Sequence, residues 1–298
     1  MKNFVLCLAL VLAPLHALSQ VQSLTHQDVK RKYIVYKPAA YATEPERQFA
    51  LVLNFAGGGM TAAEQMLYTQ MNRTAERHGF IVVYPQGIKN DWNVGFGMPY
   101  KEGTDDVGFV RAMLAAVQRG YRIDPRRVYA TGLSRGGFFS LRLAAEMPQQ
   151  FAAVASVGAP LPEPVAEHHK QRLPVGVMLV QGSSDSVVSY EGKTGAYLSA
   201  PATLDYWLKV NGMEQSPAHT RQLPPVAGDP TVASITEHVH GDRRVSLVTI
   251  KDGGHTWPGA DSFNIGLPIG RTSKAVDVNE LIWDFFRHHS NDALSPAP

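Results

Sequence analysis

The stretch Val128-Tyr-Ala-Thr-Gly-Leu-Ser-Arg-Gly136 places Ser134 between an apolar run and a segment with helical character. The apolar run favours a short buried strand, and residues 138–147 favour a helix. Gly132 and Gly136 flank the serine, and they permit the crowded backbone of a sharp strand-to-helix turn. Such a turn lifts the hydroxyl out of the sheet and directs free N–H groups of the helix toward it. The stretch therefore predicts a nucleophilic serine at the carboxyl end of a strand.

Composition indicates an ordinary globular protein. The chain has 298 residues, of which 44% are hydrophobic and 18% are charged, enough to form one large core. Neither a Pro/Ser-rich linker nor a repeat divides the sequence, so we expect a single domain. The formal net charge of +2 is too small to predict binding to nucleic acid or to an anionic membrane surface.

The N-terminal segment has the pattern of a secretory signal. A positive start, Met1–Asn3, precedes the apolar run Phe4–Leu15, which is too short to span a bilayer. We predict a signal peptide over residues 1–19 and an exported catalytic domain over residues 20–298, with an uncleaved anchor as the alternative. The only cysteine, Cys7, lies inside this signal, so the mature chain is expected to have no disulfide.

Segments that favour strands alternate with segments that favour helices along most of the chain. Strands are expected over residues 33–36, 49–55, 80–84, 128–131, 152–157, 175–180 and 245–250. Helices are expected over residues 62–77, 105–117, 138–147, 192–211 and 275–288. This order predicts an α/β fold with a mostly parallel central sheet, helices on both faces and an active site at the carboxyl ends of the strands.

Three segments fall outside this alternation. Residues 33–36 end near Pro38, which favours an edge position for that strand. Residues 214–242 carry several prolines without clear periodicity, and they indicate an insertion that either rims the site or forms a passive surface loop. Residues 290–298 are expected to form a flexible tail.

A serine nucleophile requires a base, and in this type of fold the chain order is serine, acid, histidine. His255, in Gly253-Gly-His-Thr-Trp-Pro-Gly259, follows the late strand where such a base belongs. Asp185 follows the strand over 175–180, and it would accept the imidazole N–H. The competing candidates for the acid are Asp229, Asp242 and Asp252.

The remaining late histidines fit other roles. Residues 168, 169, 288 and 289 lie in polar or helical settings typical of solvated histidines. His238 and His240 alternate along a possible strand, but no third ligand stands at a useful spacing. The sequence therefore predicts no metal site and no cofactor.

An oxyanion hole requires two backbone donors. One is expected from the N–H of Arg135, and the other from the triple glycine at residues 57–59, with Gly58 preferred over Gly57. Trp92 and Trp257 are expected on loops at the same end, where they would form an apolar platform for substrate or, alternatively, buried loop anchors.

Several of these motifs together resemble a known family. The stretches are Phe80-Ile-Val-Val-Tyr-Pro-Gln-Gly87, Asp106-Val-Gly-Phe109, Tyr121-Arg-Ile-Asp-Pro-Arg-Arg-Val-Tyr-Ala-Thr-Gly-Leu-Ser134 and Gly253-Gly-His-Thr-Trp-Pro-Gly259. They are similar to the secreted polyhydroxybutyrate-depolymerase and feruloyl-esterase group, which belongs with carbohydrate esterase family 1 in the α/β-hydrolase superfamily. The resemblance covers roughly residues 33–289. It implies ester hydrolysis without a cofactor by a triad of Ser134, Asp185 and His255.

The chain departs from this family at two positions. Ala56 stands where the family usually has a histidine before the oxyanion glycines, which removes a side chain that normally braces the loop. Arg135 stands where the family often has an asparagine, but the backbone N–H is retained. The guanidinium would favour acidic or polar substrate groups if it points into the site, or it would pair with a protein carboxylate.

These observations predict a secreted serine esterase that acts on carboxylic esters, with feruloyl or acetyl sugar esters and hydroxyalkanoate oligomers as candidate substrates. The alternatives are a serine peptidase on the same fold and a non-catalytic binding protein that has kept a hydrolase shell. The intact residues Ser134, Asp185 and His255 argue against the binding protein, whereas Ala56 and Arg135 favour it.

Overall fold

A computed structural model describes residues 19–261 and 268–291. In this part of the chain one sheet has the strand order β1-β2-β4-β3-β5-β6-β7-β10-β9-β8. The strands in chain order are β1 (Ser19–His26), β2 (Val29–Tyr36), β3 (Phe49–Phe55), β4 (Ile81–Pro85), β5 (Ile123–Leu133), β6 (Ala153–Val157), β7 (Gly176–Gly182), β8 (Ala218–Gln222), β9 (Val232–His240) and β10 (Arg243–Lys251). The strands from β4 to β10 in sheet order pair in parallel, which confirms the predicted α/β class.

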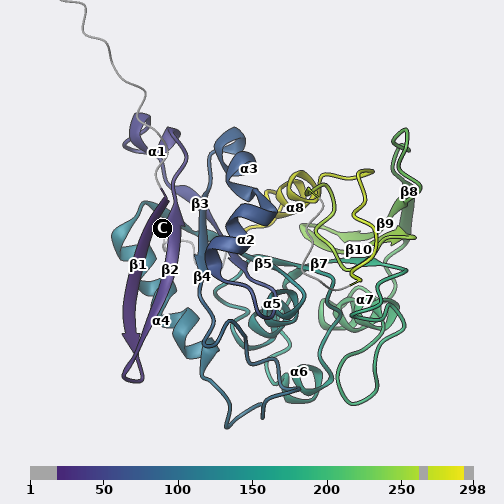
Figure 1. The fold of residues 1–298 in the computed structure, drawn as a ribbon, viewed down its shortest axis with the longest axis horizontal. Helices are drawn as coiled ribbons and strands as arrows, with labels where there is room; N and C mark the ends of the chain where they lie inside the picture. Colours follow the sequence, from purple (N-terminus) through teal and green to yellow (C-terminus); the bar gives the residue numbers. More distant parts are fainter. Residues whose placement is uncertain (1–18, 262–267, 292–298) are drawn as a thin grey trace, which may run out of the picture.

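Helices cover both faces of the sheet (Figure 1). They are α1 (Ala40–Thr43), α2 (Ala62–Thr69), α3 (Met71–His78), α4 (Asp106–Gly120), α5 (Arg135–Glu146), α6 (Glu163–His168), α7 (Ala200–Val210) and α8 (Val278–Phe286). Alternate side chains of β3 divide between two apolar cores. Leu51 and Leu53 pack with α4, α5 and α7, whereas Val52 packs with α2, α3 and α8. The sheet is therefore buried on both sides, as parallel strands require.

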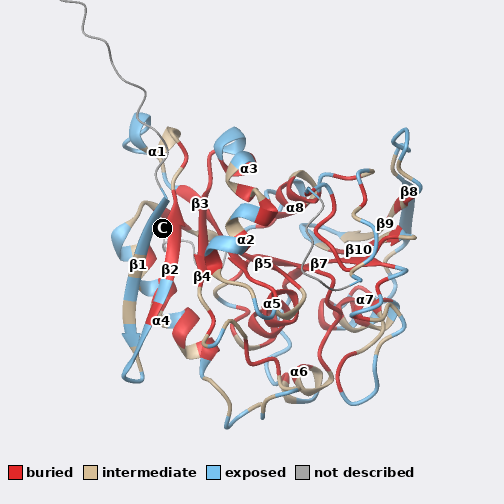
Figure 2. Ribbon diagram, viewed as in Figure 1, coloured by how far each residue is buried: buried red, intermediate tan, exposed pale blue. Residues whose placement is uncertain are grey.

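The strand over residues 29–36 is not an edge strand, contrary to the expectation from Pro38. β1 pairs along the whole outer side of β2 and takes the edge itself. Figure 2 shows β1 and β8, the two edges of the sheet, as largely exposed. β1 begins at Ser19, the last residue of the predicted signal, while residues 1–18 of that signal lie outside the described residues.

The predicted helix over residues 62–77 is two helices. Gln70 has a left-handed backbone, with φ 51° and ψ 26°, and its N–H donates to Met66 O to close α2. The chain turns there and starts α3, which ends at Gly79 in a second left-handed conformation. A left-handed residue other than glycine or asparagine has no clear sequence signal, so the break was not predictable from the pattern.

Two other expectations change in detail. The predicted helix over residues 192–211 begins only at Ala200, because Ser199 caps α7 by accepting a hydrogen bond from Ala202 N. Residues 214–242 include β8 and β9, which extend the sheet beyond β10 by antiparallel pairing. Of the predicted tail, residues 292–298 lie outside the described part.

Candidate active site

The nucleophile turn forms where the sequence predicts it. Ser134 follows β5 and precedes α5, with φ 53° and ψ −118°, a conformation that costs energy for a residue with a side chain. Its N–H donates to Val157 O at the end of β6. A Cβ on Gly136 would lie 2.2 Å from Phe55 O, and one on Gly132 would lie 2.7 Å from the same oxygen. Only glycines allow β3, β5 and α5 to approach so closely.

Asp185 and His255 come together although they are 70 residues apart. Both follow the carboxyl ends of neighbouring parallel strands, β7 and β10, and His255 Nδ1 lies 2.7 Å from Asp185 Oδ2. Because a carboxylate only accepts, the imidazole donates Nδ1–H, which leaves Nε2 as an acceptor. Both residues are buried.

Further donors hold the carboxylate in place. Asp185 Oδ1 accepts from the backbone N–H groups of Val187 (2.9 Å) and Val188 (2.8 Å), and Oδ2 also accepts from Gln181 Nε2 (3.2 Å). A carboxylate with this many donors has a fixed orientation, so the imidazole ring is fixed as well. Within the described part of the chain, none of the competing acids forms a hydrogen bond or ion pair with His255. Asp229, for example, is bonded to Thr231 and Lys274 instead.

The histidine ring also depends on a glycine that the sequence analysis did not identify. Gly158 has φ +65°, and a Cβ there would lie 3.2 Å from both Cε1 and Nδ1 of His255. A larger residue would crowd the imidazole and strain the backbone. The only sequence signal for this role is its position directly after the strand β6.

Ser134 and His255 line one cleft of about 310 Å³, together with Gly57, Gly58 and Tyr68. Among the residues that the structure describes, the Ser134 hydroxyl has no hydrogen-bond partner. Rotation about its Cα–Cβ bond is the motion that would bring the hydroxyl toward Nε2. Serine–histidine bonds in unliganded hydrolases often form only when substrate is bound.

The two candidate oxyanion donors lie beside each other. A Cβ on Gly58 would be 3.6 Å from Arg135 Cβ, and one on Gly57 would be 3.8 Å from Ser134 Cβ. The Arg135 guanidinium pairs with Asp91 (2.8 Å from Nε to Oδ1), donates to Phe96 O and lies over the Phe96 ring. Of the two orientations considered from the sequence, the structure has the one in which this side chain pairs with a protein carboxylate.

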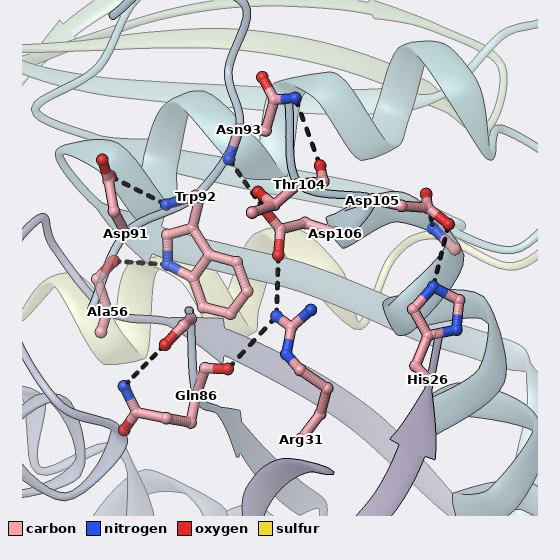
Figure 3. Close-up of polar contacts among 12 residues, drawn as sticks. His26, Arg31, Ala56, Gln86, Asp91, Trp92, Asn93, Thr104, Asp105 and Asp106 are labelled. Carbon is pink, nitrogen blue, oxygen red and sulfur yellow. Dashed lines mark hydrogen bonds and ion pairs between the residues drawn. The ribbon is translucent and has the colours of Figure 1, made fainter. Parts of the chain in front are cut away.

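Trp92 is not a substrate platform, contrary to the sequence-based expectation. Its side chain is buried, stacked on Phe139 and set edge-on against Phe55. The indole Nε1–H donates to Ala56 O at 3.0 Å, directly before the oxyanion glycines (Figure 3). Trp92 therefore braces the loop at the position where Ala56 replaces the expected histidine.

Trp257 is also wrongly predicted as a substrate contact, because it is fully buried. Its indole Nε1–H donates to Asn279 Oδ1 of α8, and its backbone N–H donates to the Tyr68 hydroxyl. Burial raises the pKa of Tyr68, so the phenol is neutral near pH 7 and its oxygen can accept this bond. Trp257 thus anchors the chain just after His255 to the helices behind it.

A buried ion pair supports the loop that carries Trp92. Arg31 of β2 and Asp106 of α4 lie 2.8 Å apart, and both are almost fully buried. Asp106 also accepts from Asn93 N (2.9 Å) and Thr104 Oγ1 (2.6 Å), as Figure 3 shows. Asn93 and Thr104, both in the loop over residues 86–104, are therefore linked through Asp106 to Arg31 of the sheet.

Potential metal ligands do not cluster in the described part of the chain. No group of three or more potential ligands is found in residues 19–261 and 268–291, and His238 instead contacts Ser216 O through Nδ1. Within the same residues, no helix is both long and apolar enough to cross a bilayer.

Comparisons with known proteins show which proteins this chain is similar to. The family model for the esterase PHB depolymerases matches residues 31–201. "Putative esterase NocK" of Nocardia uniformis is 30% identical over 83% of this chain and 76% of its own length. Feruloyl esterase B of Piromyces equi is 27% identical over 76% of this chain, but the match spans 42% of that protein.

Solved structures share the fold at low sequence identity. An acetyl xylan esterase from Aspergillus awamori superposes with a TM-score of 0.62 and 16% identity, covering 90% of this chain and 99% of the other. At that identity the likeness concerns the fold alone. The family match and the relatives together show that this chain belongs to the esterase PHB depolymerase family, whose members are carboxylic ester hydrolases on the α/β-hydrolase fold.

Proposed function

We propose that this chain is an exported serine esterase that forms an acyl-enzyme on Ser134. The observation that supports this most strongly is the bond of 2.7 Å between His255 Nδ1 and Asp185 Oδ2, at the cleft that Ser134 also lines. Export rests on the pattern of residues 1–19. The candidate substrates are those of similar enzymes, feruloyl or acetyl sugar esters, together with hydroxyalkanoate oligomers.

In the first half-reaction, His255 Nε2 takes the proton of the Ser134 hydroxyl while Oγ attacks the ester carbon. The N–H groups of Gly58 and Arg135 donate to the oxyanion that forms, and Asp185 stabilises the imidazolium. The tetrahedral intermediate collapses when its C–O bond to the alcohol breaks and His255 protonates the leaving oxygen. The acid remains attached to Ser134 as an ester.

The second half-reaction repeats these steps with water. His255 removes a proton from a water molecule that attacks the acyl carbon, and the same two N–H groups stabilise the second oxyanion. The bond from the acyl carbon to Oγ breaks, and Ser134 regains its proton from His255. The products are a free carboxylic acid and, from the first step, an alcohol.

The test is hydrolysis of p-nitrophenyl acetate by the wild type and by Ser134→Ala, with Ser23→Ala on the exposed edge strand as the matched control. We expect Ser134→Ala to lose at least about a thousandfold in kcat, and Ser23→Ala to match the wild type. Residual activity close to that of the wild type in Ser134→Ala would disprove the nucleophile. An ester and an amide of one acyl group, assayed side by side, separate an esterase from a peptidase.

A further inference from the structure

A second pocket opens beside the candidate active site. It has a volume of about 440 Å³ and is lined by residues 226–230 and by residues 269–272 with Lys274. Ile269 lines this pocket and also the cleft of Ser134 and His255. Its carbonyl oxygen accepts the His255 N–H at 2.5 Å, so the pocket adjoins the cleft on the histidine side.

The side of the cleft on which the pocket opens decides which part of an ester would reach it. In the proposed mechanism His255 delivers its proton to the departing oxygen, so the alcohol part of the substrate lies toward this histidine. The acyl part lies over Ser134 and the glycine loop instead. A pocket that begins at Ile269 is therefore placed for the alcohol arm.

The pocket carries an excess of positive charge. Arg271 and Lys274 line it together with a single acid, Asp229. Arg271 is exposed, and its guanidinium makes no hydrogen bond or ion pair with any residue in the described ranges. The Asp229 carboxylate already accepts hydrogen bonds from two backbone N–H groups, those of Thr231 (2.9 Å) and Lys274 (2.6 Å).

The cleft of Ser134 and His255 itself carries a negative charge. Glu64 lines the cleft near the glycine loop, and its carboxylate accepts from Thr61 N at 2.7 Å. This backbone bond lowers the pKa of Glu64, so the group is ionised near neutral pH. An anionic substrate arm would be repelled at Glu64 and attracted toward Arg271.

We infer that this second pocket receives an alcohol arm that ends in a carboxylate, with Arg271 as the residue that recognises the charge. Val226, Pro230 and Ile269 provide apolar walls for the carbon chain of this arm. The substrate class is an O-acylated hydroxy acid with a free carboxylate, as at the carboxyl end of a hydroxyalkanoate oligomer. Hydrolysis releases a hydroxy acid, whose new hydroxyl carries the proton from His255. The inference rests on the proposed serine esterase function.

The test compares acetyl esters of 3-hydroxybutanoate, 4-hydroxybutanoate and 6-hydroxyhexanoate with their neutral carboxamides, which have the same chain length. For at least one length, we expect kcat/KM of the wild type to favour the acid over the amide by roughly 3- to 10-fold at low salt. Arg271→Gln should abolish this preference, so that its kcat/KM values for an acid and for the amide of the same length become equal. Added salt should weaken the preference, since Arg271 is exposed.

Arg111→Gln is the matched control, because Arg111 is an exposed arginine on α4 and outside both pockets. A wild type without any preference for the acids, or a preference that survives in Arg271→Gln or disappears equally in Arg111→Gln, overturns the inference. If the wild type also fails to hydrolyse p-nitrophenyl acetate, the proposed esterase function itself is wrong. The neutral ester thus separates the two failures.

Discussion

Trp92 shows how a residue can support a candidate site from within the core. The sequence placed it correctly on a loop at the active end of the sheet, but it could not show whether the ring faces the cleft or the core. The ring is buried and its N–H satisfies Ala56 O, a carbonyl that precedes the oxyanion glycines. An indole is one of the few side chains that combine a large apolar surface with a single hydrogen-bond donor.

We expect Trp92→Phe to lower kcat by roughly tenfold and to change KM little, because the glycine loop loses the bond that holds Ala56. The unpaired carbonyl should also reduce the free energy of unfolding by about 1–3 kcal/mol. Steady-state kinetics on p-nitrophenyl acetate and urea unfolding measure the two effects.

Trp257→Phe is the matched control, since it removes an indole bond to Asn279 instead of to the glycine loop. It should lose comparable stability and keep kcat. Equal kcat values for Trp92→Phe and the wild type would show that the brace does not position the loop. Equal losses of kcat in both variants would show that the effect is only general destabilisation.

At the scale of elements, the turn between β5 and α5 was the most predictable part of the chain. Its glycines are dictated by geometry, since any Cβ on Gly136 would collide with Phe55 O. The break between α2 and α3 was not predictable, because Gln70 adopts a left-handed conformation that its residue type disfavours. Sequence patterns thus predict an element well where the backbone geometry permits only one residue type, as at Gly136. They fail where a residue adopts a conformation that its type disfavours, as at Gln70.

Gly136→Ala should destabilise the protein by about 3 kcal/mol or prevent folding, because the backbone on both sides of the turn cannot move apart. Gly120→Ala, at the end of α4, is the matched control: a Cβ there meets nothing within 4 Å. We expect that variant to be neutral or more stable by up to about 1 kcal/mol. Urea unfolding compares them, and a Gly136→Ala protein of wild-type stability would contradict the close packing.

For the whole molecule, the alternation of strands and helices was enough to predict the sheet and to place the candidate site at the carboxyl ends of its strands. It was not enough to predict the environment of each late histidine. His289 was expected to be solvated, yet it is buried, with Nδ1 on Phe285 O and Nε2 without a partner among the described residues. His169 is buried as well. The burial of His289 depends on how α8 packs against strands that are distant in the sequence, and a local sequence pattern carries no information about that packing.

The buried His289 should make stability depend on pH. Burial, with a smaller effect from Arg244, lowers the pKa of His289 from 6.5 to about 4 in the folded protein. Between these values the unfolded chain binds more protons, so the free energy of unfolding should fall as pH decreases from about 6.5 to about 4. A shift of this size corresponds to a loss of about 3 kcal/mol in the free energy of unfolding across this pH range.

His289→Leu should reduce the change in unfolding free energy between pH 7 and pH 4.5, even though it removes the bond to Phe285 O. Urea titrations of both proteins at the two pH values measure this difference. The carboxylates are the same in both proteins, so their contribution to the pH dependence cancels in the comparison. An identical pH dependence in the variant and the wild type would mean that the ring is protonated as readily in the folded state as in the unfolded chain.

The central claim is that Ser134 is activated by His255, which Asp185 orients. The most direct measurement is mass spectrometry of peptides after treatment with a fluorophosphonate, for the wild type and for His255→Ala. We predict one phosphonylated residue, Ser134, in the wild type, and labelling at least about a hundredfold slower in His255→Ala. An unlabelled wild type, a label on another serine, or equal rates in both proteins would contradict the account.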